Sequence, residues 1–184
     1  GCESMSNVEH YTTDVRQGVR AGNLTLHDRL TRGRLMSQPI ERFGVISGMI
    51  ETAENLAKDW NISREACDAY AARSHQRAAA AWANGAFADE LVPVSVPQKK
   101  GDPLLFDHDE GYRADANMET LGALRALEGG VVTAGNASQL SDGSAAVIIM
   151  EAGVAAKRGL TPLGRFIGMA VAGTEPDEMG IGPV

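Results

Sequence analysis

The sequence is poor in cysteine, in long apolar runs and in positive charge. Cys2 and Cys67 stand in no metal-ligand or redox spacing, which excludes a disulfide-dense scaffold and favours a reducing compartment. No apolar run approaches the roughly 18 residues that a membrane-spanning helix needs. The 17 Lys and Arg stand against 24 Asp and Glu, and the net charge of −7 makes the chain as a whole a poor binder of nucleic acid. We therefore expect a cytoplasmic protein that binds neither membranes nor nucleic acid.

The sequence also lacks the short motifs of self-contained active sites. It has no G-x-S-x-G nucleophile elbow, no Walker loop, no G-x-G-x-x-G and no H-E-x-x-H. The four histidines are far apart and none has a ligand-spaced neighbour, so each is interpreted as a surface or structural residue: His10, His27, His75 and His108. Catalysis by either cysteine is the less favoured interpretation, because a buried cysteine usually behaves as a small apolar residue. No metal or redox cofactor is indicated.

Neither end of the sequence has the features of a natural terminus. The chain begins at Gly1 rather than at Met, without the basic start and apolar centre of a secretory signal. Residues 180–184 resemble the middle of a loop. We therefore expect an internal piece of a longer protein.

Residues 8–47 are expected to be irregular, and the early part of the chain is rich in arginine. Over residues 1–42, six arginines stand among five carboxylates. An exposed loop of mixed charge explains this pattern as well as a phosphate-contacting surface or a subunit contact does.

Two helices are expected between residues 52 and 84. Thr52 can cap a short helix over residues 52–60, with Glu54 in its first turn. Ser63 can cap a longer helix that runs to about residue 84, with Gly85 at the expected stop position. Arg64 and Asp68 are four residues apart and are expected to form a small surface stabiliser. Five residues of the longer helix recur at helical spacing and are expected to share one face: Ala66, Tyr70, Ser74, Ala78 and Trp82. The many alanines of this helix allow close approach of a neighbouring helix or sheet.

The second half of the chain alternates candidate strands and helices. Residues 91–97 resemble a strand, and the two prolines within it favour an edge position. Residues 98–116 resemble a charged hairpin or loop, and residues 118–127 resemble a short helix. The apolar residues 144–150 are typical of a buried strand. Residues 152–158 are expected to form a helix that ends at Gly159, and residues 163–171 are expected to form another strand. This order predicts an α/β core at the C-terminal end. The glycine-rich stretch 135–143 fits a ligand-facing loop and a tight turn equally well.

Several stretches form a recognisable series along the chain. They are Gly1-Cys2-Glu3-Ser4-Met5-Ser6, Thr52-Ala53-Glu54-Asn55, Ile62-Ser63-Arg64-Glu65, Arg73-Ser74-His75-Gln76-Arg77-Ala78, Asp89-Glu90-Leu91-Val92-Pro93-Val94, Thr133-Ala134-Gly135-Asn136-Ala137-Ser138 with Asp142-Gly143, and Met179-Gly180-Ile181-Gly182-Pro183. This series resembles the thiolase family, which includes the acetyl-CoA acetyltransferases. The blocks occur in family order over essentially all of the sequence, so together they are highly specific.

The resemblance implies an α/β fold: the layered thiolase fold, present in part, with an inserted and mainly helical loop domain. Residues 1–7 would end one core segment, residues 8–130 would form the loop domain, and residues 131–184 would return to the core. Thiolases bind the CoA part of an acyl-CoA largely through the loop domain. The expected partners are therefore acyl-CoA and CoA, as substrates rather than cofactors, and the family implies a homodimer or homotetramer.

At the acyl and pantetheine end of CoA, the resemblance assigns four residues. Ser138 matches the serine near the pantetheine, with Ala134 and Ala137 beside it. Met49 matches a methionine that shapes the acyl pocket, and Gly48 replaces the histidine that many short-chain members carry.

At the nucleotide end, the resemblance assigns three more. Arg113 matches an arginine beside the CoA nucleotide, Thr120 stands where many members have a serine near the adenine, and Ile40 matches an apolar position at the same end. Residues 125–132 lack the usual Arg-Pro-Ala-Phe, which removes one aromatic contact to CoA.

The family's catalytic groups have no match in this chain. The acylated cysteine would lie before Gly1, and the histidine and the acid/base cysteine would lie beyond Val184; Cys2 and Cys67 match non-catalytic positions. In the family's reaction a thiolate attacks the acyl group to form a thioester intermediate, and the second cysteine moves a proton. The resemblance thus implies an acyltransferase that exchanges acetyl groups between acyl-CoA and CoA, to which these residues contribute CoA binding and a pocket wall but no catalytic residue.

Two alternatives remain beside an active thiolase. A non-catalytic CoA-binding or scaffolding module would bind CoA without thiolysis. A truncated product without function would expose its apolar core and aggregate.

Overall fold

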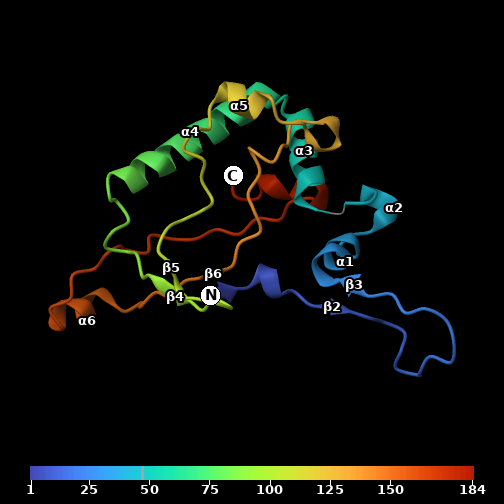
Figure 1. The fold of residues 1–184 in the computed structure, drawn as a ribbon, viewed down its shortest axis with the longest axis horizontal. Helices are drawn as coiled ribbons and strands as arrows, with labels where there is room; N and C mark the ends of the chain where they lie inside the picture. The colour runs from blue at the N-terminus through green and yellow to red at the C-terminus, as the bar shows by residue number, and fades with distance from the viewer. Residues whose placement is uncertain (47) are drawn as a thin grey trace. The chain divides into compact units, whose positions relative to one another are not determined.

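The chain divides into two compact units. The computed structural model describes residues 1–46 and 48–184, with all of their side chains except that of Glu128. One unit joins Gly1–Thr52 to Leu140–Val184, and the other is Ala53–Gln139. Among the described residues every sheet is a two-stranded antiparallel pair (Figure 1). The unit of residues 53–139 carries the candidate site and is described first.

The longest element of this unit is helix α4, Arg64–Ala83. The Ser63 hydroxyl accepts a hydrogen bond from the backbone N–H of Ala66, and Gly85 follows the last turn at a φ of 68°. A serine cap at the start and a left-handed glycine after the end are strong local signals. The predicted boundaries of this helix are confirmed.

The predicted packing face of α4 is wrong. Ala66, Tyr70 and Ser74 are exposed, and 68% of the surface of Tyr70 is accessible. The buried residues are Asp68, Ala71 and Ala72, and the two alanines cluster with Leu121 of helix α5, Met118–Gly122, which lies along α4 in Figure 1. Alanines surround α4 on several sides, so the apolar pattern does not single out one face. The burial of a carboxylate, which needs partners, sets the orientation instead.

Helix α3, Met49–Asp59, begins one turn earlier than predicted. Thr52 therefore lies inside the helix rather than at its cap, and its hydroxyl donates to the carbonyl of Met49. The Glu54 carboxylate accepts hydrogen bonds from the backbone N–H groups of Val131 and Val132, at 2.8 to 3.0 Å. A Cβ on Gly130 would lie 1.9 Å from Glu54 Oε2, so this approach requires a glycine.

The predicted strand over residues 91–97 is present in a shorter form, and residues 98–116 supply its partner strand rather than a hairpin of their own. Strand β4, Val94–Val96, pairs with β5, Leu104–Phe106, with Val94 opposite Phe106. Helix α5 is shorter than the predicted 118–127 because it ends at Gly122, and the 3-10 helix Leu127–Gly129 follows. After the hairpin, His108 packs against Trp82 of α4 with ring centroids 4.3 Å apart. This contact ties the segment after β5 to the helix.

The other unit contains short elements, some of them in the stretch expected to be irregular. Strand β2, His10–Tyr11, pairs with β3, His27–Asp28, and a long loop joins them (Figure 1). Helix α1, Arg29–Leu35, starts at Asp28, whose carboxylate accepts from two backbone N–H groups of the first turn, and α2 spans Ile40–Phe43. The expectation of an irregular segment over residues 8–47 is wrong here, because Asp28 caps a helix within it; Ser47 lies outside the described residues. Two of the arginines have carboxylate partners, in the pairs Arg29–Glu9 and Arg42–Glu175.

Residues 1–7 are joined to the segment after residue 140. Strand β1, Cys2–Glu3, pairs with β6, Gly143–Ser144, and the 3-10 helix Met5–Asn7 follows β1. The Asp142 carboxylate accepts from the hydroxyl and backbone N–H of Ser6 and from the hydroxyl of Ser4. These bonds, that of the Ser6 hydroxyl first, hold the pKa of Asp142 below its usual value.

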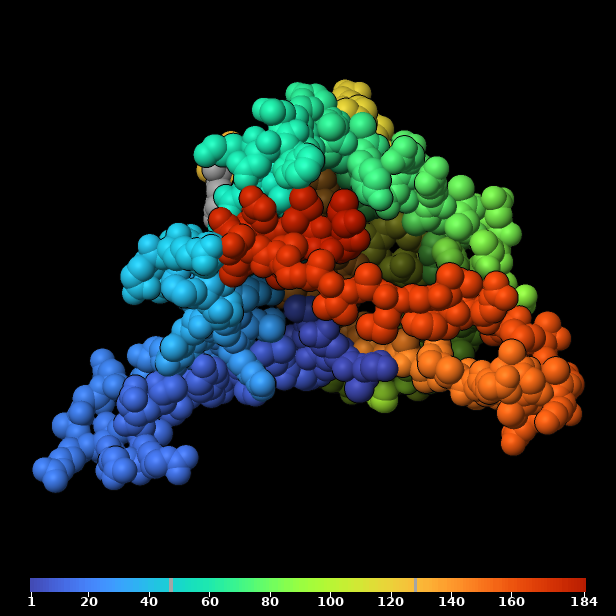
Figure 2. All heavy atoms as spheres, turned by 180° about the vertical axis from the view of Figure 1, so that it is seen from behind, coloured from blue at the N-terminus to red at the C-terminus, as the bar shows by residue number. Residues whose placement is uncertain are grey.

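The two predicted apolar strands do not form. Strand β6 ends at Ser144, and the side chains after it are exposed, with Ile148 at 89%. Residues 163–171 form no strand among the described residues, their large apolar side chains are exposed, and Figure 2 shows this segment in orange on the face in view. A strand needs a hydrogen-bonded neighbour, which the apolar pattern cannot supply by itself. The intervening helix α6, Ala152–Lys157, is present as predicted, and the 3-10 helix Pro176–Ile181 completes this unit.

None of the helices within the described residues combines the length and the apolar character that a membrane crossing would require.

Candidate ligand-binding site

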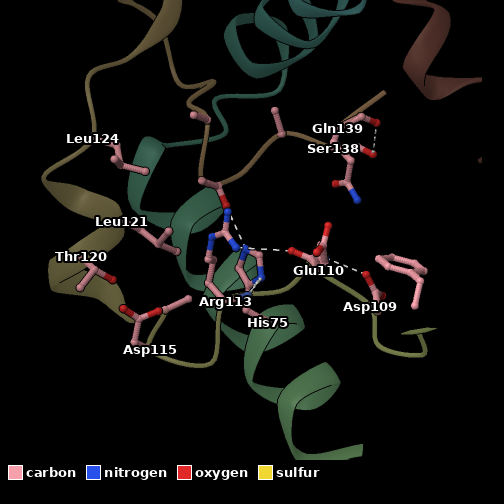
Figure 3. Close-up of a pocket in the computed structure, with 16 residues that line it drawn as sticks. His75, Asp109, Glu110, Arg113, Asp115, Thr120, Leu121, Leu124, Ser138 and Gln139 are labelled. Carbon is pink, nitrogen blue, oxygen red and sulfur yellow. Dashed lines mark hydrogen bonds between the residues drawn. The ribbon is translucent and has the colours of Figure 1, made fainter. Parts of the chain in front are cut away.

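An open cleft of about 810 Å³ lies within the unit of residues 53–139. Its walls come from α4, α5, the segment after β5 and residues 134–139 (Figure 3). The lining residues are His75, Phe106, Asp109, Glu110, Gly111, Arg113, Asp115, Ala116, Thr120, Leu121, Leu124, Ala134, Gly135, Ala137, Ser138 and Gln139.

Five of the seven predicted site residues line this cleft: Arg113, Thr120, Ala134, Ala137 and Ser138. The other two lie in the other unit. Ile40 is the first residue of α2 and Met49 the first of α3, and both are about half exposed. That these residues bind CoA stays a prediction.

A buried charged network holds residues 133–136 against α4. Asp68, only 2% exposed, accepts hydrogen bonds from Arg64 Nε at 2.7 Å and from Asn136 Nδ2 at 3.0 Å. Asn136 also accepts from the backbone N–H of Thr133, which is fully buried. The pair of Arg64 and Asp68 is thus not the surface stabiliser that its spacing predicted, because its carboxylate faces this loop rather than solvent.

The same arginine positions the opposite wall. Nη2 of Arg64 donates to the backbone carbonyls of Leu121 and Leu124, at 2.8 and 2.9 Å. The side chains of both leucines reach Gly135, where an added Cβ would lie 2.6 Å from each. The loop can therefore approach α5 only with a glycine at this position, and the resulting cleft has an apolar wall beside the backbone of residues 134–138.

The charged side chains that line the cleft are one arginine and three carboxylates. The exposed Arg113 donates through Nη1 to the carbonyl of Glu110 at 3.4 Å, and it takes part in none of the ion pairs found among the described residues. Its guanidinium can therefore receive an anion, while Asp109, Glu110 and Asp115 add negative charge to the lining. These carboxylates would reduce the attraction for a highly charged ligand.

The two hydroxyls of the predicted site differ in availability. Thr120 Oγ1 accepts from the backbone N–H of Asn117 and so belongs to the capping box of α5. Ser138 Oγ is exposed and donates to the carbonyl of Gln139 at 3.2 Å. The hydroxyl of Ser138 is therefore the freer of the two to contact a ligand.

Among the lining residues that sequence reasoning did not assign to the site, His75 and Phe106 bring rings to the cleft. His75 lies seven residues after Asp68, which places both on one face of α4, and this spacing could have identified it once the burial of Asp68 was known. Phe106, at the end of β5, brings an aromatic ring to a cleft whose expected aromatic residue is absent from residues 125–132. No local sequence signal marks Phe106, because the hairpin fold alone brings it there.

The cysteines differ in exposure. Cys2 is exposed, whereas Cys67 is half-buried, and burial together with the neighbouring Asp68 carboxylate raises the pKa of its thiol. A raised pKa leaves little thiolate at neutral pH and makes Cys67 a poor nucleophile. Among the side chains that the structure describes, no three from His, Cys, Asp or Glu are grouped as metal ligands.

Comparisons with known proteins agree with one another. Residues 1–153 match the family described as "Thiolase, N-terminal domain". The whole chain is 45% identical to an acetyl-CoA acetyltransferase of Thiocystis violacea, of which it covers 46%. The chain thus spans about half the length of the curated relatives it matches.

Solved structures show the same relation. A crystal structure of the Bacillus anthracis acetyl-CoA acetyltransferase matches 99% of this chain and 45% of its own, with a TM-score of 0.83 and 38% identity. Human mitochondrial 3-ketoacyl-CoA thiolase in complex with CoA matches 99% of this chain and 44% of its own, with a TM-score of 0.81 and 38% identity. The similarity establishes a thiolase fold for the part that the chain covers. The chain belongs to the thiolase family.

Proposed function

We propose that this chain supplies the CoA-binding cleft of a thiolase-type acyltransferase, which transfers an acetyl group between acyl-CoA and CoA. The observation that carries the proposal is the convergence of Arg113, Ser138 and the apolar loop backbone on one cleft. A CoA molecule needs a cation for its phosphates and an apolar channel for its pantetheine arm, and the cleft offers both. The relative whose structure contains CoA supports the same ligand class.

The proposed roles follow the chemistry of each wall. The guanidinium of Arg113 would meet the 3′-phosphate of the nucleotide, because a planar fork of donors matches phosphate oxygens. Ser138 and the two alanines beside it would flank the pantetheine arm. CoA would act as a substrate, and the nucleophile and proton-transfer groups would come from outside these residues. The cytoplasmic location, the homodimer or homotetramer and the loop domain over residues 8–130 stay predictions.

The first test fills the cleft. Ser138→Trp in the intact native protein should abolish CoA binding in a calorimetric titration, because the indole would occupy the space beside residues 134–137. Ser95→Trp is the matched control, since Ser95 is exposed on β4 and lies outside the cleft lining. Unchanged affinity in a folded Ser138→Trp protein would remove this residue from the proposed site.

The second test separates the nucleotide contact from general charge. Arg113→Gln should weaken binding of CoA more than that of dephospho-CoA, which lacks the 3′-phosphate. Arg77→Gln provides the control, because Arg77 is exposed on α4 and does not line the cleft. Equal losses for both ligands would contradict a contact to the 3′-phosphate.

A third measurement distinguishes the enzyme from a non-catalytic module. The intact protein is assayed for cleavage of acetoacetyl-CoA by CoA beside the binding titration. Binding with thiolysis supports the proposal, whereas binding without thiolysis would support a CoA-binding module that retains the fold.

A further inference from the structure

His75 joins two segments of the cleft that are far apart in the sequence. Its Nδ1 accepts a hydrogen bond from the backbone N–H of Arg113 at 3.1 Å, and its Nε2 lies 3.4 Å from the carbonyl oxygen of Gly135. Figure 3 shows the imidazole beside the Arg113 side chain at the centre of the cleft. The ring is half-buried and stands on α4, the longest helix of the unit.

The two contacts together require one form of the imidazole. A backbone N–H can only donate, so Nδ1 must carry a lone pair. A carbonyl oxygen can only accept, so Nε2 must carry the proton for the second contact to be a hydrogen bond. The neutral Nε2–H tautomer satisfies both partners, and the imidazolium does not, because its Nδ1 proton would face the N–H of Arg113.

We propose that His75 is a positioning residue for CoA, which holds the Arg113 segment and the Gly135 loop at the separation that the ligand needs. This inference rests on the proposed function. The imidazole itself need not touch CoA: its bond to Arg113 places the residue whose guanidinium would meet the nucleotide. Its contact with Gly135 places the loop whose backbone and Ser138 would flank the pantetheine arm.

The neighbouring residue Gln76 makes a comparable link that does not join the two walls of the cleft. Gln76 donates from Nε2 to the carbonyl of Ala116 at 3.1 Å, so it also links α4 to the segment that follows β5. It lies outside the cleft lining, and the hydrogen bond of its side chain goes to Ala116 rather than to the loop of residues 133–139. Gln76→Leu therefore removes one link to the same segment and leaves the link between the two walls in place.

The test compares CoA affinity in His75→Leu, His75→Gln and Gln76→Leu versions of the intact protein. Leu cannot replace either bond, and the loss of one to two hydrogen bonds should raise the Kd for CoA about tenfold. The amide of Gln can accept with its oxygen and donate with its nitrogen, so His75→Gln should stay within about twofold of the unaltered protein. Gln76→Leu should stay within the same range.

A second measurement follows the hydrogen bond between His75 and the backbone N–H of Arg113 in the absence of ligand. The backbone amide of Arg113 should exchange its hydrogen faster in His75→Leu, and at the unaltered rate in Gln76→Leu. In the unaltered protein, imidazole nitrogen shifts should show the neutral Nε2–H tautomer, a measurement that does not depend on any variant folding.

The outcomes separate the two proposals. An unaltered protein that does not bind CoA overturns the proposed function. Normal binding in the unaltered protein together with an unaffected His75→Leu overturns only the role of His75. An equal loss in Gln76→Leu, no rescue by Gln, or another tautomer likewise overturns that role.

Discussion

Replacing Asp68 with alanine should destabilise the unit of residues 53–139 more than any single surface change. The carboxylate is 2% exposed and receives hydrogen bonds from Arg64 and Asn136. Removal of one partner from a buried ion pair costs about 3–5 kcal/mol. The Arg64 side chain is 21% exposed and keeps two carbonyl acceptors, so water and protein retain part of its solvation. The lower end, about 3 kcal/mol, is therefore expected.

Chemical denaturation of the intact protein, followed by circular dichroism, measures this loss. Asp68→Asn keeps the shape and an acceptor oxygen but loses the charge, so it should cost less, about 1–2 kcal/mol. The matched control is Asp89→Ala, because Asp89 is exposed and lies in the same unit. A loss below about 1 kcal/mol for Asp68→Ala would refute the reasoning, since a buried charged acceptor with two donors cannot be removed so cheaply.

Three other changes have defined outcomes. Gly130→Ala should lower the denaturation midpoint, because its Cβ would lie 1.9 Å from the Glu54 carboxylate, and Gly122→Ala is the control, since a Cβ there meets no atom within 4 Å; an unchanged midpoint in Gly130→Ala would contradict that close approach. Iodoacetamide should alkylate Cys2 before Cys67 at neutral pH, since burial raises the pKa of the Cys67 thiol, and peptide mass spectrometry decides the order. The lowered pKa of Asp142 stabilises the fold at pH values above its unfolded value near 3.8, and this contribution is lost as the pH falls through the lower folded value; Asp142→Asn should abolish that pH dependence in denaturation curves.

Local signals predicted the helices well and their packing poorly. Ser63 and Gly85 mark the ends of α4 by their own hydrogen bonding and backbone conformation, so a few neighbouring residues suffice. The face that packs depends on partners 50 to 70 residues away, such as Leu121 and Asn136. With alanines on several sides of the helix, nothing local distinguishes that face.

The apolar segments illustrate the same limit for strands. Residues 144–150 have the composition of a buried strand, yet β6 ends at Ser144 and Ile148 is exposed. An apolar composition indicates that a segment favours burial, but a strand is buried only when other strands pair with it. The prediction therefore failed on a property that is not local to the segment.

The residues of the candidate site were predictable where they share one sequence motif and not where the fold brings separate segments together. A short motif contains Ala134, Ala137 and Ser138, so the resemblance could assign all three together. The sequence alone indicates a structural or surface role for His75, because the spacing of histidines is informative only for groups on one segment. Its partners, Arg113 and Gly135, come from two other segments that the fold brings to α4.

One face of α4 therefore serves both stability and the proposed binding. Asp68 and His75 stand seven residues apart, two turns of the helix, and each bonds to the loop of residues 133–136. Asp68 fixes that loop through a side-chain amide, and His75 joins its backbone to the segment that carries Arg113. Because one rigid helix carries both contacts, loss of Asp68 should move the loop away from His75 as well. CoA affinity should then fall in Asp68→Ala even where the protein is still folded, whereas the control Asp89→Ala should leave the affinity unchanged.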